Sequence, residues 1–138
     1  MLKLNNVEFS FPFFFDIMKV VMEMSIKIDR IASQMVKEIS YVLATEVKDS
    51  DIKFVTVTDV KVTNDLSFAK VYVTVLKEDK KEETLIALKN ASGFIRRELA
   101  DRLEIRHIPE LEFVYDESIE YGKKIEDILE NIHENKQD

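Results

Sequence analysis

A β-hairpin is the strongest constraint that this sequence places on its fold. Residues 54–63 and 69–75 are both rich in valine and threonine, and only the short segment Asn-Asp-Leu-Ser-Phe separates them. Apolar and polar residues alternate in both runs, which is typical of strands, and the segment between them is typical of a turn. The odd-numbered positions of the second run, from Ala69 to Val75, are apolar, so we expect them to face the core.

The alternation slips within the first of these two runs. Val55 and Val57 stand at odd positions, whereas Val60 and Val62 stand at even positions. A strand cannot keep both pairs on one face unless one extra residue is inserted. The sequence therefore predicts a β-bulge near Asp59.

Helical periodicity flanks the hairpin on both sides. Apolar residues recur at helical spacing over residues 28–47, and Ser25 is a candidate N-cap for this helix. They recur again over residues 85–103, but Gly93 lies among them. A glycine inside a helix costs about 1 kcal/mol relative to alanine. We therefore expect at Gly93 either a kink or a break between two helices.

A third strand and a last helix complete the chain. Leu111, Phe113 and Tyr115 alternate with polar or smaller residues, and residues 119–133 carry a helical apolar side.

The length of 138 residues suits a single domain with one core. Because the chain has no cysteine, disulfides and cysteine-ligated zinc are excluded. The net charge is −7, but the acidic residues concentrate after residue 108, so local basic stripes decide whether phosphate can bind.

Residues 1–24 differ from the rest because they contain an aromatic cluster around Phe13. We interpret them as an extension outside the core domain, disordered or arising from a start codon chosen too early. An added packing helix and a membrane-surface segment are the alternatives. We expect a folded domain over residues 25–118 and an acidic helical tail over residues 119–138.

The order of the predicted elements is that of type II KH domains, which pack helices on one face of a three-stranded sheet. An ordinary KH domain clamps a nucleic-acid backbone with a Gly-x-x-Gly loop. This chain has only Gly93 and Gly122, so it has no such loop. At the corresponding junction Ala91, Ser92 and Gly93 resemble the Ala-x-Gly kink of the ribosome-binding factor A family. Other stretches that resemble this family, in the same order, are residues 30–35, 37–39, 60–66, 69–74 and 106–113, followed by Asp116 and Ser118.

The resemblance implies an α+β, type II KH-like fold and a binding factor that catalyses nothing. It implies binding to the free 30S ribosomal subunit through 16S ribosomal RNA, near the decoding region. It also implies a cytoplasmic role in late maturation of that subunit, including processing of the 16S RNA 5′ end, and a link to growth in the cold. The extension over residues 1–24 has no counterpart that we can place, and we assign the acidic tail no role.

Two groups of residues are candidates for contact with RNA. On the first helix Arg30, Gln34, Lys37 and Tyr41 step by four, three and four, so they share one face. Cations and amides in such a row can follow a phosphate backbone, and a tyrosine can stack on a base. The alternative is an ordinary solvated helix face. The second group lies around the expected kink and contains Lys89, Ser92, Gly93, Arg96, Arg97 and Arg106, with Arg102 nearby.

The kink matters because a second helix starting there would expose backbone N–H groups to an anion. Gly93 would also allow close approach of a backbone. A purely structural kink, with the arginines in ion pairs on the helix surface, is the alternative.

Other functions have weaker support in the sequence. The chain has no glycine-rich phosphate loop and no Gly-x-Ser-x-Gly elbow, so we expect no enzyme, no cofactor and no small-molecule substrate. His107 and His133 are isolated, so we expect no metal site. We also expect a monomer that does not associate with membranes. A KH-like binder of another RNA and a protein-interaction module remain alternatives.

Overall fold

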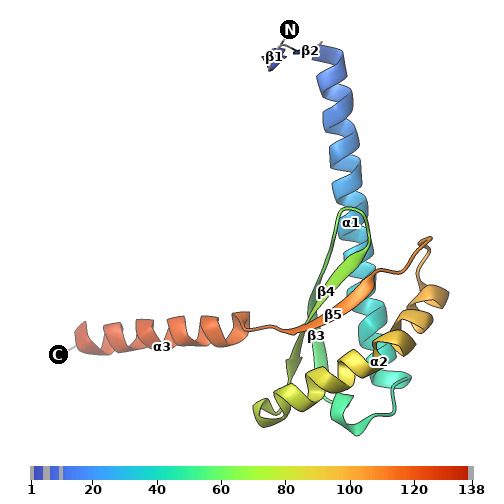
Figure 1. Ribbon diagram of the computed structural model, residues 1–138. Helices are drawn as coiled ribbons and strands as arrows, with labels where there is room; N and C mark the ends of the chain where they lie inside the picture. Colours follow the sequence, from blue (N-terminus) through green and yellow to red (C-terminus); the bar gives the residue numbers. More distant parts are fainter. Residues whose placement is uncertain (1, 5–6, 10, 137–138) are drawn as a thin grey trace.

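The computed structural model describes residues 2–4, 7–9 and 11–136. It has the expected α+β composition (Figure 1). The elements in chain order are β1 (Leu2–Leu4), β2 (Val7–Phe9), α1 (Phe11–Thr45), η1 (Ser50–Ile52), β3 (Val55–Val62), β4 (Phe68–Val75), η2 (Glu78–Lys80), α2 (Lys81–Arg102), β5 (Glu110–Tyr115) and α3 (Ser118–Lys136).

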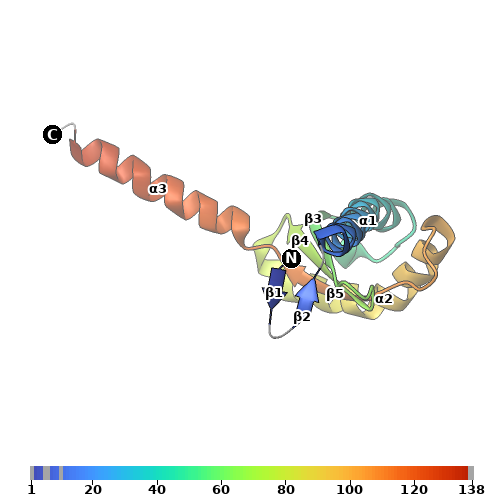
Figure 2. The same cartoon turned by 90° about the horizontal axis from the view of Figure 1, so that it is seen from above.

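A three-stranded sheet forms the centre of the fold. Its order is β3-β4-β5, with β3 antiparallel and β5 parallel to β4. α1 packs on β3, α2 packs on β5, and the two helices contact each other, so both cover one face of the sheet (Figure 2). Ala69, Val71 and Val73 are buried beneath them, which confirms the expected core face of β4. The assignment to type II KH domains stays a prediction.

The predicted β-bulge is present in β3. The register against β4 shifts between Val57 and Asp59, and Val57 and Val60 are both buried. The shift leaves Thr58 as the extra residue, and its hydroxyl donates to the Tyr72 carbonyl at 3.2 Å and to Asp116 at 2.6 Å. The bulge therefore keeps both valines in the core and ties β3 to the end of β5.

The turn of the hairpin is held by the carboxylate of Asp65. Its Oδ1 accepts the hydroxyls of Ser67 and Thr63, each at 2.7 Å, and the Ser67 N–H at 3.2 Å. These bonds, the Ser67 hydroxyl first, lower the pKa of Asp65 from 3.8 to about 2. The next residue, Leu66, has a φ of 60°, an uncommon conformation that this network supports.

Replacing Asp65 with asparagine should weaken the turn in a pH-dependent way. The folded carboxyl has the lower pKa, so its contribution to stability is complete above about pH 4 and is lost as pH falls toward 2. We expect Asp65→Asn to lower the Tm slightly at neutral pH, with the difference from the parent shrinking between those two pH values. Asp101→Asn, which removes an exposed carboxylate from α2, is the control for net charge. A Tm difference that stays constant with pH would contradict the prediction.

The expectation about the start of the first helix is wrong. α1 begins at Phe11, so Ser25 lies inside a helix and is not its N-cap. Asp16, Lys19, Glu23 and Lys27 alternate in sign at spacings of three and four, which favours helix across the supposed start. Figure 1 shows that the first half of α1 projects beyond the sheet. Residues 11–24 are therefore helical, although the predicted division of the chain into three segments is not tested by this.

α2 is one helix from Lys81 to Arg102, so the break that we considered at Gly93 is absent. Its ribbon curves along its length in Figure 1. Burial of Leu88, Ile95 and Leu99 on both sides of the glycine supplies more free energy than the roughly 1 kcal/mol that a glycine costs a helix. The helix therefore continues through a residue that favours a break.

α3 is present as predicted, and its residues 121–135 are all exposed. Its first turn is fixed because Asp116 accepts the Ser118 N–H at 3.0 Å and the Tyr115 hydroxyl donates to Glu120 at 3.1 Å. The hydrogen bonds from Ser118 and Thr58 lower the pKa of Asp116. The expected apolar side of this helix remains exposed, at Ile125, Ile128, Leu129 and Ile132.

Candidate RNA-binding surface

The predicted row on the first helix faces solvent. Arg30, Gln34, Lys37 and Tyr41 are all exposed. They lie on the side of α1 away from the sheet, because the intervening apolar residues, such as Met35 and Ile39, are fully buried against it. The structure thus brings the four side chains into one accessible row. Contact of this row with RNA stays a prediction.

A groove of about 530 Å³ runs beside this row. One wall is α1, and the other is the end of α2 with the residues that follow it. The polar side chains that line it are Lys27, Arg30, Gln34, Lys37, Glu38, Arg102 and Glu104. Three cations from α1 and one amide therefore open onto the groove, an arrangement that can follow a phosphate backbone.

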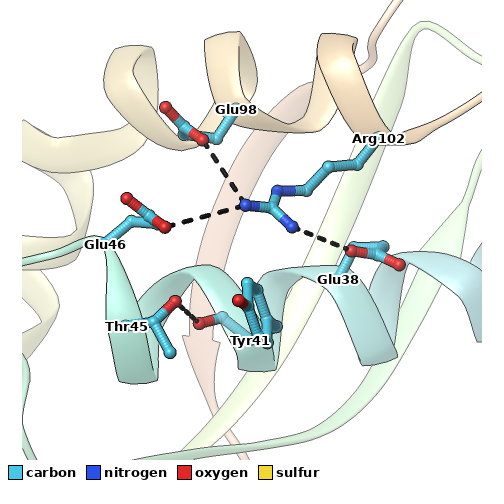
Figure 3. A network of polar contacts seen from close by, with 6 residues as sticks. All are labelled: Glu38, Tyr41, Thr45, Glu46, Glu98 and Arg102. Atoms are coloured by element: carbon cyan, nitrogen blue, oxygen red, sulfur yellow. Dashed lines mark hydrogen bonds and ion pairs between the residues drawn. The ribbon is translucent and has the colours of Figure 1, made fainter.

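Arg102 is bound by its protein neighbours, although we had placed it in the basic group around Gly93. Its guanidinium nitrogens lie 3.8 Å from carboxylate oxygens of Glu38, Glu46 and Glu98 (Figure 3). The guanidinium carbon also lies 4.7 Å from the centre of the Tyr41 ring. One face of Tyr41 is thus used inside the protein. Arg102 therefore fastens α2 to α1 and contributes little free positive charge to the groove.

Arg96 and Arg97 differ in their surroundings, although they are neighbours in the sequence. Arg96 is half-buried, and its Nη2 donates to the Ile108 carbonyl at 2.9 Å. Its Nε is also buried, without a hydrogen-bond partner among the described residues. Arg97 is exposed, in line with Lys89 and Gly93 at spacings of four. Arg97 and Lys89 therefore remain candidates for RNA contact, whereas Arg96 holds the segment between α2 and β5.

The residues at the expected kink lie inside the continuous helix α2, and the kink itself stays a prediction. Ala91 and Ser92 are half-buried, and the Ser92 hydroxyl donates to the Lys89 carbonyl at 2.7 Å. Because the helix is continuous, the backbone N–H groups at this place are used within it. The expected exposed amides for an anion are therefore absent. Gly93 is exposed, and a Cβ placed there would have no neighbouring atom within 4 Å.

Gly93→Ala should therefore stabilise the chain. Alanine gains about 1 kcal/mol over glycine in a helix interior, and nothing opposes the added methyl group. We expect the free energy of unfolding, measured by urea denaturation, to rise by about that amount. Ala100→Gly, at another exposed position of α2, should lower it by a similar amount. A Gly93→Ala variant less stable than the parent would show that the helix needs glycine at this point.

Sequence reasoning missed the groove and the role of Arg102. Lys27 could have been found, because it continues the row of Arg30 and Gln34 by three more residues. Glu98 and Arg102 stand four apart, which predicts an ion pair. The contacts of Arg102 with Tyr41 and Glu38 join residues about sixty positions apart in the sequence, so no local sequence pattern predicts them.

Arg106 is exposed, in the segment between α2 and β5. The carbonyl that Arg96 holds belongs to Ile108, two residues later. The position of Arg106 therefore depends on Arg96, and its contact with RNA stays a prediction.

Comparison with known proteins decides the family. The sequence profile described as ribosome-binding factor A matches residues 27–129. The chain belongs to the ribosome-binding factor A family. The family member from Staphylococcus carnosus is 51% identical over 106 residues, which cover 76% of this chain and 92% of that protein. The extension before residue 27 lies outside the matched region.

Solved structures of the family agree with the fold. The crystal structure of ribosome-binding factor A from Thermus thermophilus is 27% identical, with a TM-score of 0.59, covering 64% of this chain and 94% of that one. A homology model of the Thermus thermophilus factor, fitted into a cryo-electron microscopy map of a complex with the 30S subunit, is 28% identical. Its TM-score is 0.54, and the match covers 62% of this chain and 91% of that one.

Membrane spans and metal sites are both absent from the part of the chain that the structure describes. None of its helices is both long enough and apolar enough to cross a bilayer. No group of three or more histidine, cysteine, aspartate or glutamate side chains is placed to hold a metal ion within the same residues.

Proposed function

We propose that this chain binds the free 30S ribosomal subunit through its 16S ribosomal RNA and assists late maturation of that subunit in the cytoplasm. Family membership supports this, together with the Thermus thermophilus relative fitted into a 30S complex. The observation on this chain that carries the proposal is the groove beside α1, where Lys27, Arg30 and Lys37 converge. Such a surface recognises the backbone of folded RNA by charge and shape.

The proposed action is binding without catalysis. The factor would favour one arrangement of the immature RNA, so that processing enzymes can complete the 16S 5′ end. Cells depleted of the protein should then accumulate 16S RNA with unprocessed 5′ ends, which primer extension would measure. Normal 5′ ends in depleted cells, with the protein still bound to 30S subunits in undepleted cells, would separate binding from any role in processing.

Co-sedimentation in sucrose gradients tests the binding itself. We expect the full chain to travel with free 30S subunits at low salt, to be released as salt rises, and to be absent from 70S ribosomes. Release follows from counterions returning to the phosphates that the basic side chains had neutralised. Equal retention on 50S subunits, or retention that salt does not change, would contradict the proposal. Crosslinking in cells would then identify another RNA if the KH-like alternative holds.

A further inference from the structure

The projecting part of α1 carries an apolar seam in contact with solvent. We define the seam by six side chains, each between 41% and 57% exposed. They are Phe14, Ile17, Met18, Val20, Val21 and Met24. Figure 1 shows this part of the helix beyond the edge of the sheet, and Figures 1 and 2 show α3 leaving the domain in another direction.

The seam continues the core-facing side of the same helix. Phe14, Ile17, Val21 and Met24 are spaced by three, four and three, and Ile28, Ile31 and Met35 continue that spacing. Ile31 and Met35 are buried against the sheet. A repeat of alternating threes and fours is the pattern by which one helix packs along another. The residues before Ile28 therefore have the pattern of a packed helix without the sheet to pack on.

The charged residues of this segment do not lie within the apolar seam. Asp16, Lys19 and Glu23 occupy the opposite side of the helix, because successive helix residues turn by about 100° and all three point well away from the repeat. A second helix could lie along the seam while all three stay in water. Together with Lys27, these charged residues comprise two acids and two bases. It therefore offers no excess positive charge to anionic lipid or to RNA.

The area of the seam matches what a stable pair of proteins requires. Aromatic side chains carry about 150–250 Å² each, and the five aliphatic residues of the seam are smaller, so six half-exposed side chains present roughly 500 Å². That is at the upper end of what a monomer usually exposes in one patch, about 300–600 Å². Two such seams facing each other would bury roughly 1,000 Å², about the smallest area expected of a specific interface.

We propose that the apolar seam binds a second copy of this chain, so that two α1 helices pair in the free protein. In a two-fold dimer each copy contributes the same surface. The three-four repeat runs along the whole seam, so the seam of one copy can pack against the seam of the other. A groove of about 520 Å³ lies between Val21 and Met24 of the seam and the hairpin residue Val62, so the seam is open to solvent on the side of the hairpin. We had expected a monomer from the sequence. The pairing lies outside the family-matched residues and does not rest on the proposed function.

Sedimentation equilibrium of the full chain tests the pairing, with concentrations spanning about two decades around the micromolar range. The mass should rise from 16.2 kDa toward twice that value with increasing concentration. Val21→Glu places two carboxylates in the interface and should raise the dissociation constant at least about a hundredfold. Met22→Glu makes the same chemical change at the next residue, which is 60% exposed and lies off the seam. This variant should pair like the parent.

Helical content measured by circular dichroism should match in the two variants, so that a difference in mass reports the interface and not the helix. A parent chain that stays at 16.2 kDa throughout would overturn the proposal. Equal weakening by Val21→Glu and Met22→Glu would overturn the assignment to this seam. A monomeric parent that floats with vesicles of neutral lipid would assign the seam to a bilayer surface instead.

Discussion

Reversing two charges beside the groove should lower the affinity for the 30S subunit by about two orders of magnitude. The variant is Arg30→Glu with Lys37→Glu, which replaces two cations of α1 by two anions where we propose that phosphates lie. Both side chains are exposed, so the free energy of unfolding should change by less than about 1 kcal/mol. The slope of log affinity against log salt should become shallower by roughly 2, because about two fewer counterions are released.

A matched charge reversal elsewhere separates the groove from net charge. Lys123→Glu with Lys124→Glu makes the same change on exposed residues of α3. We expect this control to keep most of the affinity and nearly the parent salt slope. If both double variants lose affinity equally, the effect is general repulsion and the groove is not the site. If neither loses affinity, α1 does not contact the RNA.

The parts of the fold that could be predicted are those with a local cause. The change from odd to even valines between Val57 and Val60 required one extra residue, and the structure places the register shift there. The odd positions of β4 could be assigned to the core because the side-chain period of a strand is two. The covering of one sheet face by two helices came from resemblance, since no local pattern states which face a helix will cover.

The wrong N-cap at Ser25 and the absent break at Gly93 have one cause, because in both places a local preference was outweighed by neighbouring residues. Ser25 is a good N-cap residue, but a cap acts only where the helix stops, and the residues before it continue the helix. Gly93 disfavours helix by about 1 kcal/mol, yet Leu88 and Ile95 on either side of it are fully buried. Propensity marks where a helix can end, and packing decides whether it does.

The candidate site was predictable on α1 and less so on α2. The row from Arg30 to Tyr41 depends only on helical spacing, and it is exposed as that spacing requires. Arg96 and Arg97 cannot be told apart by composition, because consecutive helix residues point about 100° apart and either could have faced the protein. The path of the chain after α2 decides which arginine faces the protein, because it brings the Ile108 carbonyl next to Arg96.

The two arginines should therefore differ in their effect on stability when each is replaced by alanine. Arg96→Ala removes the hydrogen bond to the Ile108 carbonyl and leaves the acceptor of a buried residue unpaired, so we expect a loss of about 2 kcal/mol in the free energy of unfolding. Arg97→Ala should change that quantity by less than about 0.5 kcal/mol, because the side chain is exposed. Urea denaturation measures both values.

Hydrogen exchange and subunit binding then separate the two roles. In Arg96→Ala the backbone N–H groups of residues 103–108 should exchange faster, since the segment between α2 and β5 loses its hydrogen bond to the helix. In Arg97→Ala exchange should match the parent, while affinity for the 30S subunit falls about tenfold through loss of one phosphate contact. Equal stability of the two variants would mean that the Ile108 bond contributes nothing to folding. An unchanged affinity of Arg97→Ala would remove Arg97 from the RNA-binding surface, and Lys89 and Arg106 would then be the candidates left outside the groove beside α1.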